Sequence, residues 1–351
     1  MQYFQAKISY GMQRHRCGIL AALTIALTAT AAQAGQFVTI DMPGSGTAAN
    51  TGTQIAAINA KNVVTGAYVT NDLAVHGFVG NVGGPYTIID APGAGTGARQ
   101  GTSAVAINNK GTIAGTEVSD AGYFGFIRDA QGNFTTFDAG GTKQTIVWAI
   151  NSKGAITGWA GQQSFVRSKN GKIKLFQAAN AKATYAAGIN TAGVIAGYYK
   201  DSSGLYHAFL RAHDGSITTI DVDGYYNTQA TAIDDNGDIV GSATMGGTVS
   251  AMLRTSNGTI SIFIPSGCRA AYAESINASG AITGTCYDDN YIRHGFVRQP
   301  DGSMSIFDAP GAGSTSPQGT FPSVIAADGK IVGYYVDANN ANHGFRRNAG
   351  N

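Results

Sequence analysis

The sequence has few charged residues, few prolines and almost no glutamate. Charged side chains occupy 13% of the 351 positions, about half the share in an average globular protein, and glutamate occurs only at Glu117 and Glu274. This scarcity of Lys and Glu excludes a coiled coil, and a hydrophobic content of 43% excludes a disordered chain. Collagen is excluded because only 8 prolines accompany 49 glycines, without a three-residue period. The composition is typical of a turn-rich, mainly β protein.

The first 34 residues have the pattern of a secretion signal. Three basic residues precede an apolar run over 18–30, and Ala32-Gln33-Ala34 is a small-x-small cleavage pattern. We therefore expect a secreted or periplasmic protein whose mature chain begins at Gly35. The alternative is an uncleaved membrane anchor, for which an apolar run of about 17 residues is short. The mature chain contains no apolar run long enough to span a membrane.

Charge gives no indication of a nucleic-acid partner. The leader contains three basic residues and no acidic one, so its removal lowers the net charge from +2 to about −1. Lys and Arg form no cluster of the kind that binds phosphate backbones. We expect no nucleic-acid partner and no cofactor.

Cysteine is scarce as well, and the mature chain keeps only Cys268 and Cys286. Two thiols in an oxidising compartment favour a disulfide over a metal site, which needs more ligands. If Ile276 faces Ala281 across a turn, Cys286 lies opposite Ala271, three residues from Cys268. The sequence therefore predicts a Cys268–Cys286 disulfide.

One short segment occurs seven times. Ala106–Gly115 (AINNKGTIAG) has six further copies, at intervals of 39 to 49 residues. These copies are 57–66, 149–158, 188–197, 232–241, 275–284 and 324–333. Each repeat reads as four short strands rich in β-branched and aromatic residues. Asn in the first position and Gly in the fourth, as in Asn108–Gly111, favour a type I turn between the first two strands. The recurrent Asn is therefore interpreted as a turn residue.

The last repeat lacks one strand, and a matching segment is found near the N-terminus. The last repeat stops at its third strand, His343–Arg347, and the missing fourth strand is found near the N-terminus, where 37–44 matches 304–311. A closed ring has a use for such a strand, and a linear solenoid has none. The sequence predicts an all-β fold: a seven-bladed β-propeller of four-stranded blades, one domain over 35–351, closed by an N-terminal strand that completes the last blade.

The repeats also resemble a known family. Gly188–Tyr198, His207–Phe209 and Thr218–Asp221 are similar to the bacterial extracellular HAF repeats, and the resemblance covers nearly all of the mature chain. It implies a secreted repeat protein and supplies no activity or catalytic residues.

Histidine and aspartate patterns do not indicate a metal site. Four histidines recur at the start of the third strand, on different blades and away from the axis, so they cannot converge on one ion. These residues are His76, His207, His294 and His343. We expect them to have a structural role, bonding a loop or a backbone carbonyl. Asp234–Asp238 resembles the start of a calcium loop but lacks the bidentate carboxylate that should follow.

Residues that break the repeat are the candidates for ligand binding. Trp148 and Glu274 occupy a position near the axis where the other repeats have Ala, Val, Thr or Ser. Trp159, Tyr199, Tyr287 and Tyr335 end second strands, on the face of the loops between blades. Aromatic side chains with sparse polar groups around a concave mouth suit a sugar or a peptide. The alternative is that these aromatic residues fill gaps between sheets.

Three functions remain open. No nucleophile elbow, zinc-protease motif or phosphate loop is present, which favours an exported, non-catalytic propeller that binds a glycan or a protein. The alternatives are a secreted hydrolase or lyase with an Asp/Tyr site at the channel mouth, and a structural envelope or matrix protein.

The disulfide can be tested chemically. Alkylation of the denatured, unreduced exported protein should leave the mass unchanged, because neither cysteine has a free thiol. Reduction before alkylation should then add two alkyl groups. Modification of Cys268 and Cys286 without reduction would contradict the prediction.

Overall fold

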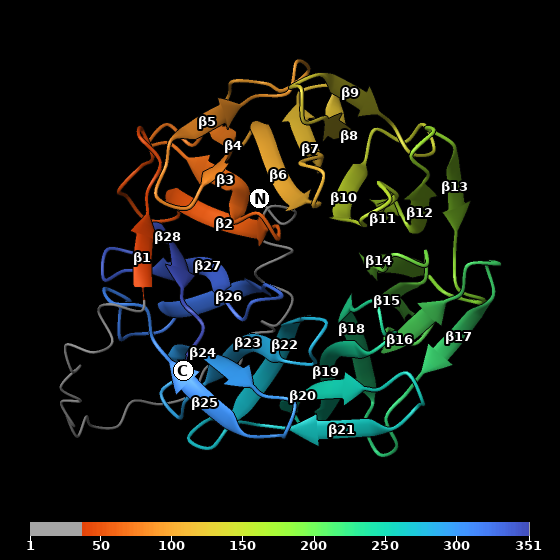
Figure 1. The fold of residues 1–351 in the computed structure, drawn as a ribbon. Helices are drawn as coiled ribbons and strands as arrows, with labels where there is room; N and C mark the ends of the chain where they lie inside the picture. Colours follow the sequence, from red (N-terminus) through yellow and green to blue (C-terminus); the bar gives the residue numbers. More distant parts are fainter. Residues whose placement is uncertain (1–36, 351) are drawn as a thin grey trace.

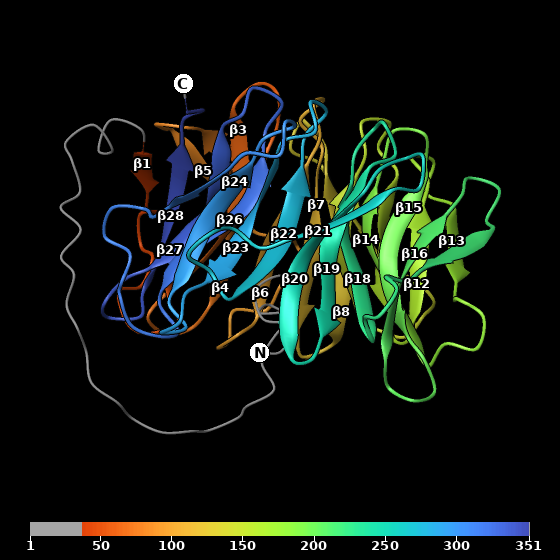
Figure 2. The ribbon, with the colours of Figure 1, turned by 90° about the horizontal axis from the view of Figure 1, so that it is seen from below.

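The computed structural model describes residues 37–350, so the predicted leader, 1–34, lies outside the described residues. Its twenty-eight strands form seven four-stranded antiparallel blades around a central axis (Figure 1), and single parallel residue pairs join four of these blades into one sheet. Seen from the side, inner strands such as β22 and β26 run from one face of the ring to the other (Figure 2). The described residues contain no helix, and hence none that could cross a membrane. The predicted seven-bladed β-propeller is confirmed.

In six blades the four strands follow one another in sequence from the axis outward, and the seventh takes its outermost strand from the N-terminal end of the described chain. The first four blades are β2 (Gly52–Ile58), β3 (Val63–Val69), β4 (Val75–Asn81) and β5 (Tyr86–Ile89); β6 (Gly101–Ile107), β7 (Ile113–Ser119), β8 (Gly122–Arg128) and β9 (Phe134–Phe137); β10 (Thr145–Ile150), β11 (Ile156–Ala160), β12 (Gln163–Arg167) and β13 (Ile173–Phe176); β14 (Ala183–Ile189), β15 (Ile195–Lys200), β16 (Tyr206–Arg211) and β17 (Ile217–Ile220). The last three are β18 (Asn227–Ile233), β19 (Ile239–Met245), β20 (Thr248–Arg254) and β21 (Ile260–Phe263); β22 (Ala270–Ile276), β23 (Ile282–Tyr287), β24 (Arg293–Arg298) and β25 (Met304–Phe307); β26 (Gly319–Ile325), β27 (Ile331–Val336), β28 (Asn342–Arg347) and β1 (Phe37–Ile40).

The ring closes in the way predicted from the sequences at the two ends of the chain. Strand β1 pairs antiparallel with β28, from Phe37 opposite Arg347 to Ile40 opposite Gly344. Neighbouring inner strands contact one another all the way round, including β26 with β2. The seventh blade therefore contains both ends of the described chain.

Every inner strand contains a β-bulge at the same repeat position. The pairing between first and second strands shifts by one residue there, because the inner strand contains one extra residue. The bulged residues are Ala56, Val105, Trp148, Ala187, Thr231, Glu274 and Ser323. Trp148 and Glu274, selected as departures from the repeat, are thus both bulge residues.

The recurring second-strand glycine is explained by this bulge. Gly66 lies between the carbonyl oxygen of Gln54 on the inner strand and the ring of Phe78 on the third strand. A Cβ at this position would overlap the carbonyl oxygen, and the same holds in each blade. These glycines are Gly66, Gly115, Gly158, Gly197, Gly241, Gly284 and Gly333. Glycine is required here for close approach of two backbones rather than for a positive φ.

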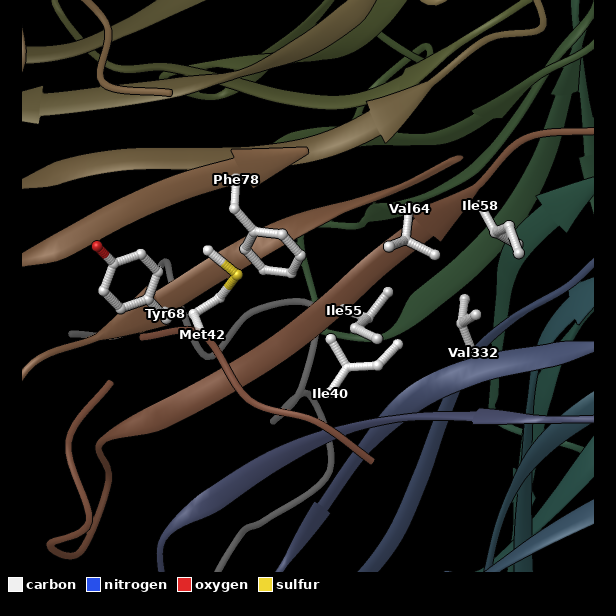
Figure 3. Close-up of a cluster of buried hydrophobic side chains, with 8 residues drawn as sticks. All are labelled: Ile40, Met42, Ile55, Ile58, Val64, Tyr68, Phe78 and Val332. Atoms are coloured by element: carbon white, nitrogen blue, oxygen red, sulfur yellow. The ribbon is translucent and has the colours of Figure 1, made fainter. Parts of the chain in front are cut away.

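The hydrophobic core lies between neighbouring blades. Figure 3 shows one such cluster, in which Ile40 of β1 and Val332 of β27 pack with residues of the first blade. Its members are Ile40, Met42, Ile55, Ile58, Val64, Tyr68, Phe78 and Val332. The third strand of six blades adds a fully buried phenylalanine, such as Phe78, and the fifth blade has Met252 instead. Because both faces of each sheet are covered, burial of apolar surface holds the ring together.

Asparagine side chains connect successive blades at the first turn. The Asn151 side-chain oxygen accepts hydrogen bonds from the backbone N–H groups of Lys153 and Ala155, as expected of a turn residue. Its side-chain amide also donates to the carbonyl of Asn190 in the next blade, at 2.8 Å. Five asparagines make this bond to the following blade: Asn59, Asn108, Asn151, Asn190 and Asn277. Their interpretation as turn residues was therefore correct but incomplete.

Cation–π contacts connect blades nearer the rim. Arg211, at the end of a third strand, stacks its guanidinium on Phe176, at the end of the preceding blade's fourth strand, at 4.7 Å. Arg167 over Phe137, Arg298 over Phe263 and Arg347 over Phe307 repeat this contact at 4.6–5.1 Å. Burial lowers the pKa of Arg167, Arg211 and Arg347. A partly desolvated guanidinium over a ring contributes about 1–2 kcal/mol.

The predicted disulfide joins the loop before β22 to strand β23. Cys268 and Cys286 are bonded, with their Cα atoms 5.9 Å apart. Cys286 does lie opposite Ala271, although Ile276 pairs with Ile282 rather than with Ala281. The turn is one residue longer than assumed, and the bulge at Glu274 restores the predicted pairing.

The inter-blade asparagine bonds can be tested by truncation. Asn151→Ala removes two turn bonds and one bond between blades, so the free energy of unfolding should fall by about 2 kcal/mol. Urea denaturation measures this change. Asn133→Ala, in an exposed turn with local bonds only, is the matched control and should change stability by less than about 0.5 kcal/mol. Equal effects of the two variants would contradict a role in joining blades.

Candidate functional site

The two bulge residues that break the repeat lie far apart. Trp148 is on β10 in the third blade and Glu274 is on β22 in the sixth, on opposite sides of the ring (Figure 1). Both side chains are partly buried. Each is surrounded by its own group of aromatic residues, so the structure separates the predicted site into two.

The first group is an aromatic wall formed by the third and fourth blades. Trp148 lies against Trp159 at 5.1 Å between ring centroids, and Trp159 meets Tyr185 of the next blade edge-on at 5.6 Å. Tyr185 packs on Tyr198 at 5.2 Å, and Tyr198 on Tyr206 at 5.7 Å. These five residues come from five strands, β10, β11, β14, β15 and β16. Trp159 is buried, while the other four rings are partly exposed.

The second group, the blade 6–7 cluster, consists of Tyr272, Glu274, Tyr287, Arg293 and Tyr334. The Nε of Arg293 donates a hydrogen bond to the Tyr287 hydroxyl at 2.9 Å, and the guanidinium lies over the Tyr287 ring at 5.1 Å. Tyr272 packs against Tyr287 with ring centroids 5.8 Å apart. Glu274 is near enough for its charge to act on Tyr272 and on Tyr334.

Phe321 connects this cluster to the seventh blade. Its ring lies under the Arg293 guanidinium at 4.9 Å and stacks on Tyr334 at 4.7 Å with an interplanar angle of 8°. Arg293 also donates a hydrogen bond from Nη1 to the carbonyl of Pro317. Contacts to two blades therefore hold the guanidinium in place.

Tyr272 and Tyr334 of the cluster keep their hydroxyl protons at neutral pH because their pKa values are raised. Burial raises the pKa of Tyr272, and the neighbouring Tyr287 and the charge of Glu274 raise it further. Burial also raises the pKa of Tyr334, whose hydroxyl oxygen is buried without a hydrogen-bond partner. A phenol with a raised pKa is a poor general base. The cluster is therefore suited to binding rather than to proton abstraction by tyrosine.

Two of the six predicted ligand-binding residues lie elsewhere. Tyr199 and Tyr335 stack on His207 and His343, at 5.0 and 4.9 Å between ring centroids. Successive residues of a strand point to opposite faces of the sheet, so Tyr199 faces away from its neighbour Tyr198 in the aromatic wall. Trp148 lies with Trp159, and Glu274 lies near Tyr287. Ligand binding by these six residues stays a prediction.

Sequence reasoning missed Tyr185 and Tyr272. Both stand two residues before the bulge, where three of the other blades have the polar residues Gln54, Ser103 and Gln229. Comparison of this repeat position, which the sequence allows, would have found them. Tyr334 joins Tyr272 only through packing of the sixth blade on the seventh, whereas Arg293 lies opposite Tyr287 on the neighbouring strand of the sixth blade.

The recurrent histidines join the third strand to acidic residues on either side. His207 Nδ1 is 2.9 Å from Asp221 after the fourth strand, and its Nε2 is 3.5 Å from Asp201 before the third. His294 and His343 have equivalent pairs of carboxylates, and His76 has one at 3.0 Å. The His343–Asp41 pair ties the C-terminal strand to the N-terminal one. The partners are carboxylates of loop residues, so the expected contact with a loop is found, whereas a backbone carbonyl, the other expected partner, is not used.

A cavity of about 280 Å³ opens at the mouth formed by the turns between first and second strands. This is the face opposite the inter-blade loops. None of the six predicted ligand-binding residues lines it. Among residues 37–350, no group of three or more His, Cys, Asp or Glu side chains is arranged to hold a metal ion.

Known proteins with this fold have little sequence in common with the chain. Virginiamycin B lyase from Staphylococcus aureus has a TM-score of 0.59 at 13% identity, over 89% of this chain and 99% of the lyase. The β-propeller domain of the Trilobed protease from Pyrococcus furiosus has 0.57 at 10%, over 85% and 94%. The BP39L lectin from Burkholderia pseudomallei has 0.52 at 10%, over 83% and 93%. These likenesses show the β-propeller fold alone. No family model and no curated protein sequence matches the chain.

Histidine protonation should make stability depend on pH. Burial alone would lower the pKa of His207, but its bonds to Asp221 and Asp201 outweigh burial and raise it. The hydrogen bond to Asp308 raises the pKa of His294. A raised folded-state pKa stabilises the protein below the unfolded value of about 6.5 and loses this effect as pH rises through the folded value. The free energy of unfolding should therefore fall as pH rises from about 6 to 8.

A double variant tests the assignment. His207→Gln combined with His294→Gln should flatten the decline, measured by urea denaturation across this pH range. His213→Gln, in the turn after β16, is the control and should leave the slope unchanged. An unaltered slope in the double variant would assign the pH dependence to other groups.

Proposed function

We propose that this protein is an exported binding scaffold whose propeller presents the aromatic wall to a carbohydrate. The proposal rests on one observation: Trp148, Trp159, Tyr185, Tyr198 and Tyr206 form a continuous run of ring contacts. Among the seven bulge positions, only that of the third blade has a tryptophan, Trp148. Aromatic rings pack on the apolar faces of sugars, and polar groups at their edges add orientation.

The comparisons are compatible with binding without establishing it. A lectin shares the propeller architecture at 10% identity, which supports the ability of such a ring to bind sugars. The resemblance to HAF repeats and the leader pattern support a location outside the cytoplasm. Membership of the HAF-repeat family and export from the cytoplasm both stay predictions.

Enzymatic activity at the blade 6–7 cluster is the second candidate. Glu274, Arg293 and three tyrosines are brought together there, and one protein of similar fold is a lyase. Raised pKa values of Tyr272 and Tyr334 oppose a tyrosine base, so Glu274 would have to take the proton. This requirement makes binding the better-supported function.

Glycan binding can be tested by screening the purified protein on a glycan array and measuring affinity for retained glycans by calorimetry. Trp148→Ala and Tyr185→Ala should each weaken binding roughly tenfold or more, because aromatic anchors dominate such contacts. Tyr291→Ala, which removes a ring 54% exposed on the loop between β23 and β24 of the sixth blade, is the matched control and should bind normally.

Two outcomes would reject the proposal. One is an array without any retained glycan, and the other is wild-type affinity in both wall variants. Turnover of a retained glycan that is abolished by Glu274→Gln would instead support the enzyme.

A further inference from the structure

Charge is distributed unevenly along the chain. The stretch 139–200, which covers the third blade and the two inner strands of the fourth, contains eight Lys and Arg residues and no Asp or Glu. The other described residues contain 12 basic and 21 acidic side chains. The eight basic residues are Lys143, Lys153, Arg167, Lys169, Lys172, Lys174, Lys182 and Lys200. This basic segment is an exception to the expectation that Lys and Arg form no cluster.

The basic segment coincides with the aromatic wall. Trp148, Trp159, Tyr185 and Tyr198 lie within it, and Tyr206 follows shortly after its end. The blades that carry the wall therefore also carry an excess of positive charge, in a ring whose remaining part is acidic. Such segregation of charge creates a positive potential on one side of a molecule, which attracts anions.

Lys200 adds a positive charge to the wall itself. It stands two residues after Tyr198 on β15, so both side chains point to the same face of the sheet. It pairs with Tyr206 on β16, and its Nζ lies over the Tyr206 ring at 5.5 Å from the centroid. The Lys200 side chain is partly exposed. Its ammonium group is therefore placed to contact an anionic group of a molecule that lies on the wall.

Lys182 supplies a second ammonium group at the same end of the sheet. Its backbone N–H donates to the carbonyl of Lys200 at 2.8 Å. Its Nζ donates to the carbonyl of Ser202 at 2.6 Å, and the side chain is exposed. An ammonium group has three donors, so two remain for a bound molecule. Both lysines lie on the side of the inter-blade loops.

The nearest carboxylate in sequence has other partners. Asp201 accepts a hydrogen bond from the backbone N–H of Leu205 at 2.8 Å and lies 3.5 Å from Nε2 of His207. In the described part of the chain, the only lysine that forms an ion pair is Lys330, with Asp328. Lys182 and Lys200 therefore keep charges that no carboxylate of the protein pairs with.

We propose that the aromatic wall binds an acidic oligosaccharide, with sugar faces on the rings and carboxylates beside Lys182 and Lys200. Aromatic rings pack on the apolar faces of sugars whether or not the sugar is charged, whereas the lysines attract only a charged one. This inference rests on the proposed carbohydrate binding and specifies the class of carbohydrate.

The charge preference can be measured by calorimetry with oligomers of galacturonate, mannuronate and hyaluronate, and with their neutral methyl esters. At least one acidic oligomer should bind, and its methyl ester should bind at least about fivefold more weakly. Salt screens exposed charges, so raising the salt concentration about tenfold should weaken binding of the acidic oligomer and leave that of the methyl ester unchanged.

A double variant tests the two lysines. Lys182→Gln combined with Lys200→Gln should weaken binding of the acidic oligomer by about tenfold. Its affinity for the methyl ester should be unchanged, which also shows that the wall is still folded. Lys153→Gln is the matched control, because it removes an exposed charge of the same basic segment from the turn between β10 and β11, at the opposite face of the ring. It should change affinity by less than about twofold.

The outcomes separate this inference from the proposed function. Equal affinity for the acidic oligomers and their methyl esters would overturn the inference while carbohydrate binding stands. So would wild-type affinity of the double variant, or retention of neutral glycans on the array without binding of any acidic oligomer. An array that retains no glycan would reject both. Tighter binding of single-stranded DNA than of every acidic oligomer would overturn the inference in favour of a nucleic-acid surface.

Discussion

Closure of the ring is the constraint on which the rest of the structure depends. Each blade is a thin sheet with two apolar faces, and it can bury both only between two neighbours. Pairing of β1 with β28 gives the first and last blades their missing neighbour, and the cluster around Ile40 and Val332 packs across that junction. The inter-blade asparagine bonds then join five pairs of neighbouring blades, and the arginine–phenylalanine contacts join four.

The β-bulge at the same position of every inner strand is the place where the residues near the axis differ from blade to blade. The bulge inserts one extra residue into each inner strand, and the side chain at this position differs between blades. Small residues occupy most bulges, whereas Trp148 and Glu274 bring two different chemistries to opposite sides of the axis. At the turn-side mouth, Asp234 likewise replaces the Asn that five other blades have at this position. In each case the scaffold stays constant and single positions change.

Much of the architecture was predictable because comparison of the repeats shows which sequence features recur in every blade. Seven copies of one turn, a displaced fourth strand and the spacing of the strands were sufficient for blade number and closure. The Cys268–Cys286 pair was also predicted, although the bulge at Glu274 was not recognised. The candidate site was less predictable. Tyr198 and Tyr199 are adjacent in sequence but lie on opposite faces of the sheet, and only one of them belongs to the aromatic wall.

The sequence by itself determined the blade, because strand pattern, turn residues and close-approach glycines are local properties that recur in each repeat. Only the tertiary structure decided which residues of different blades meet. Trp159 reaches Tyr185, and Arg293 reaches Phe321, across interfaces between blades. The cavity on the turn-side mouth likewise exists only when five blades place their isoleucines around one axis. Such contacts depend on ring closure, which no single repeat contains.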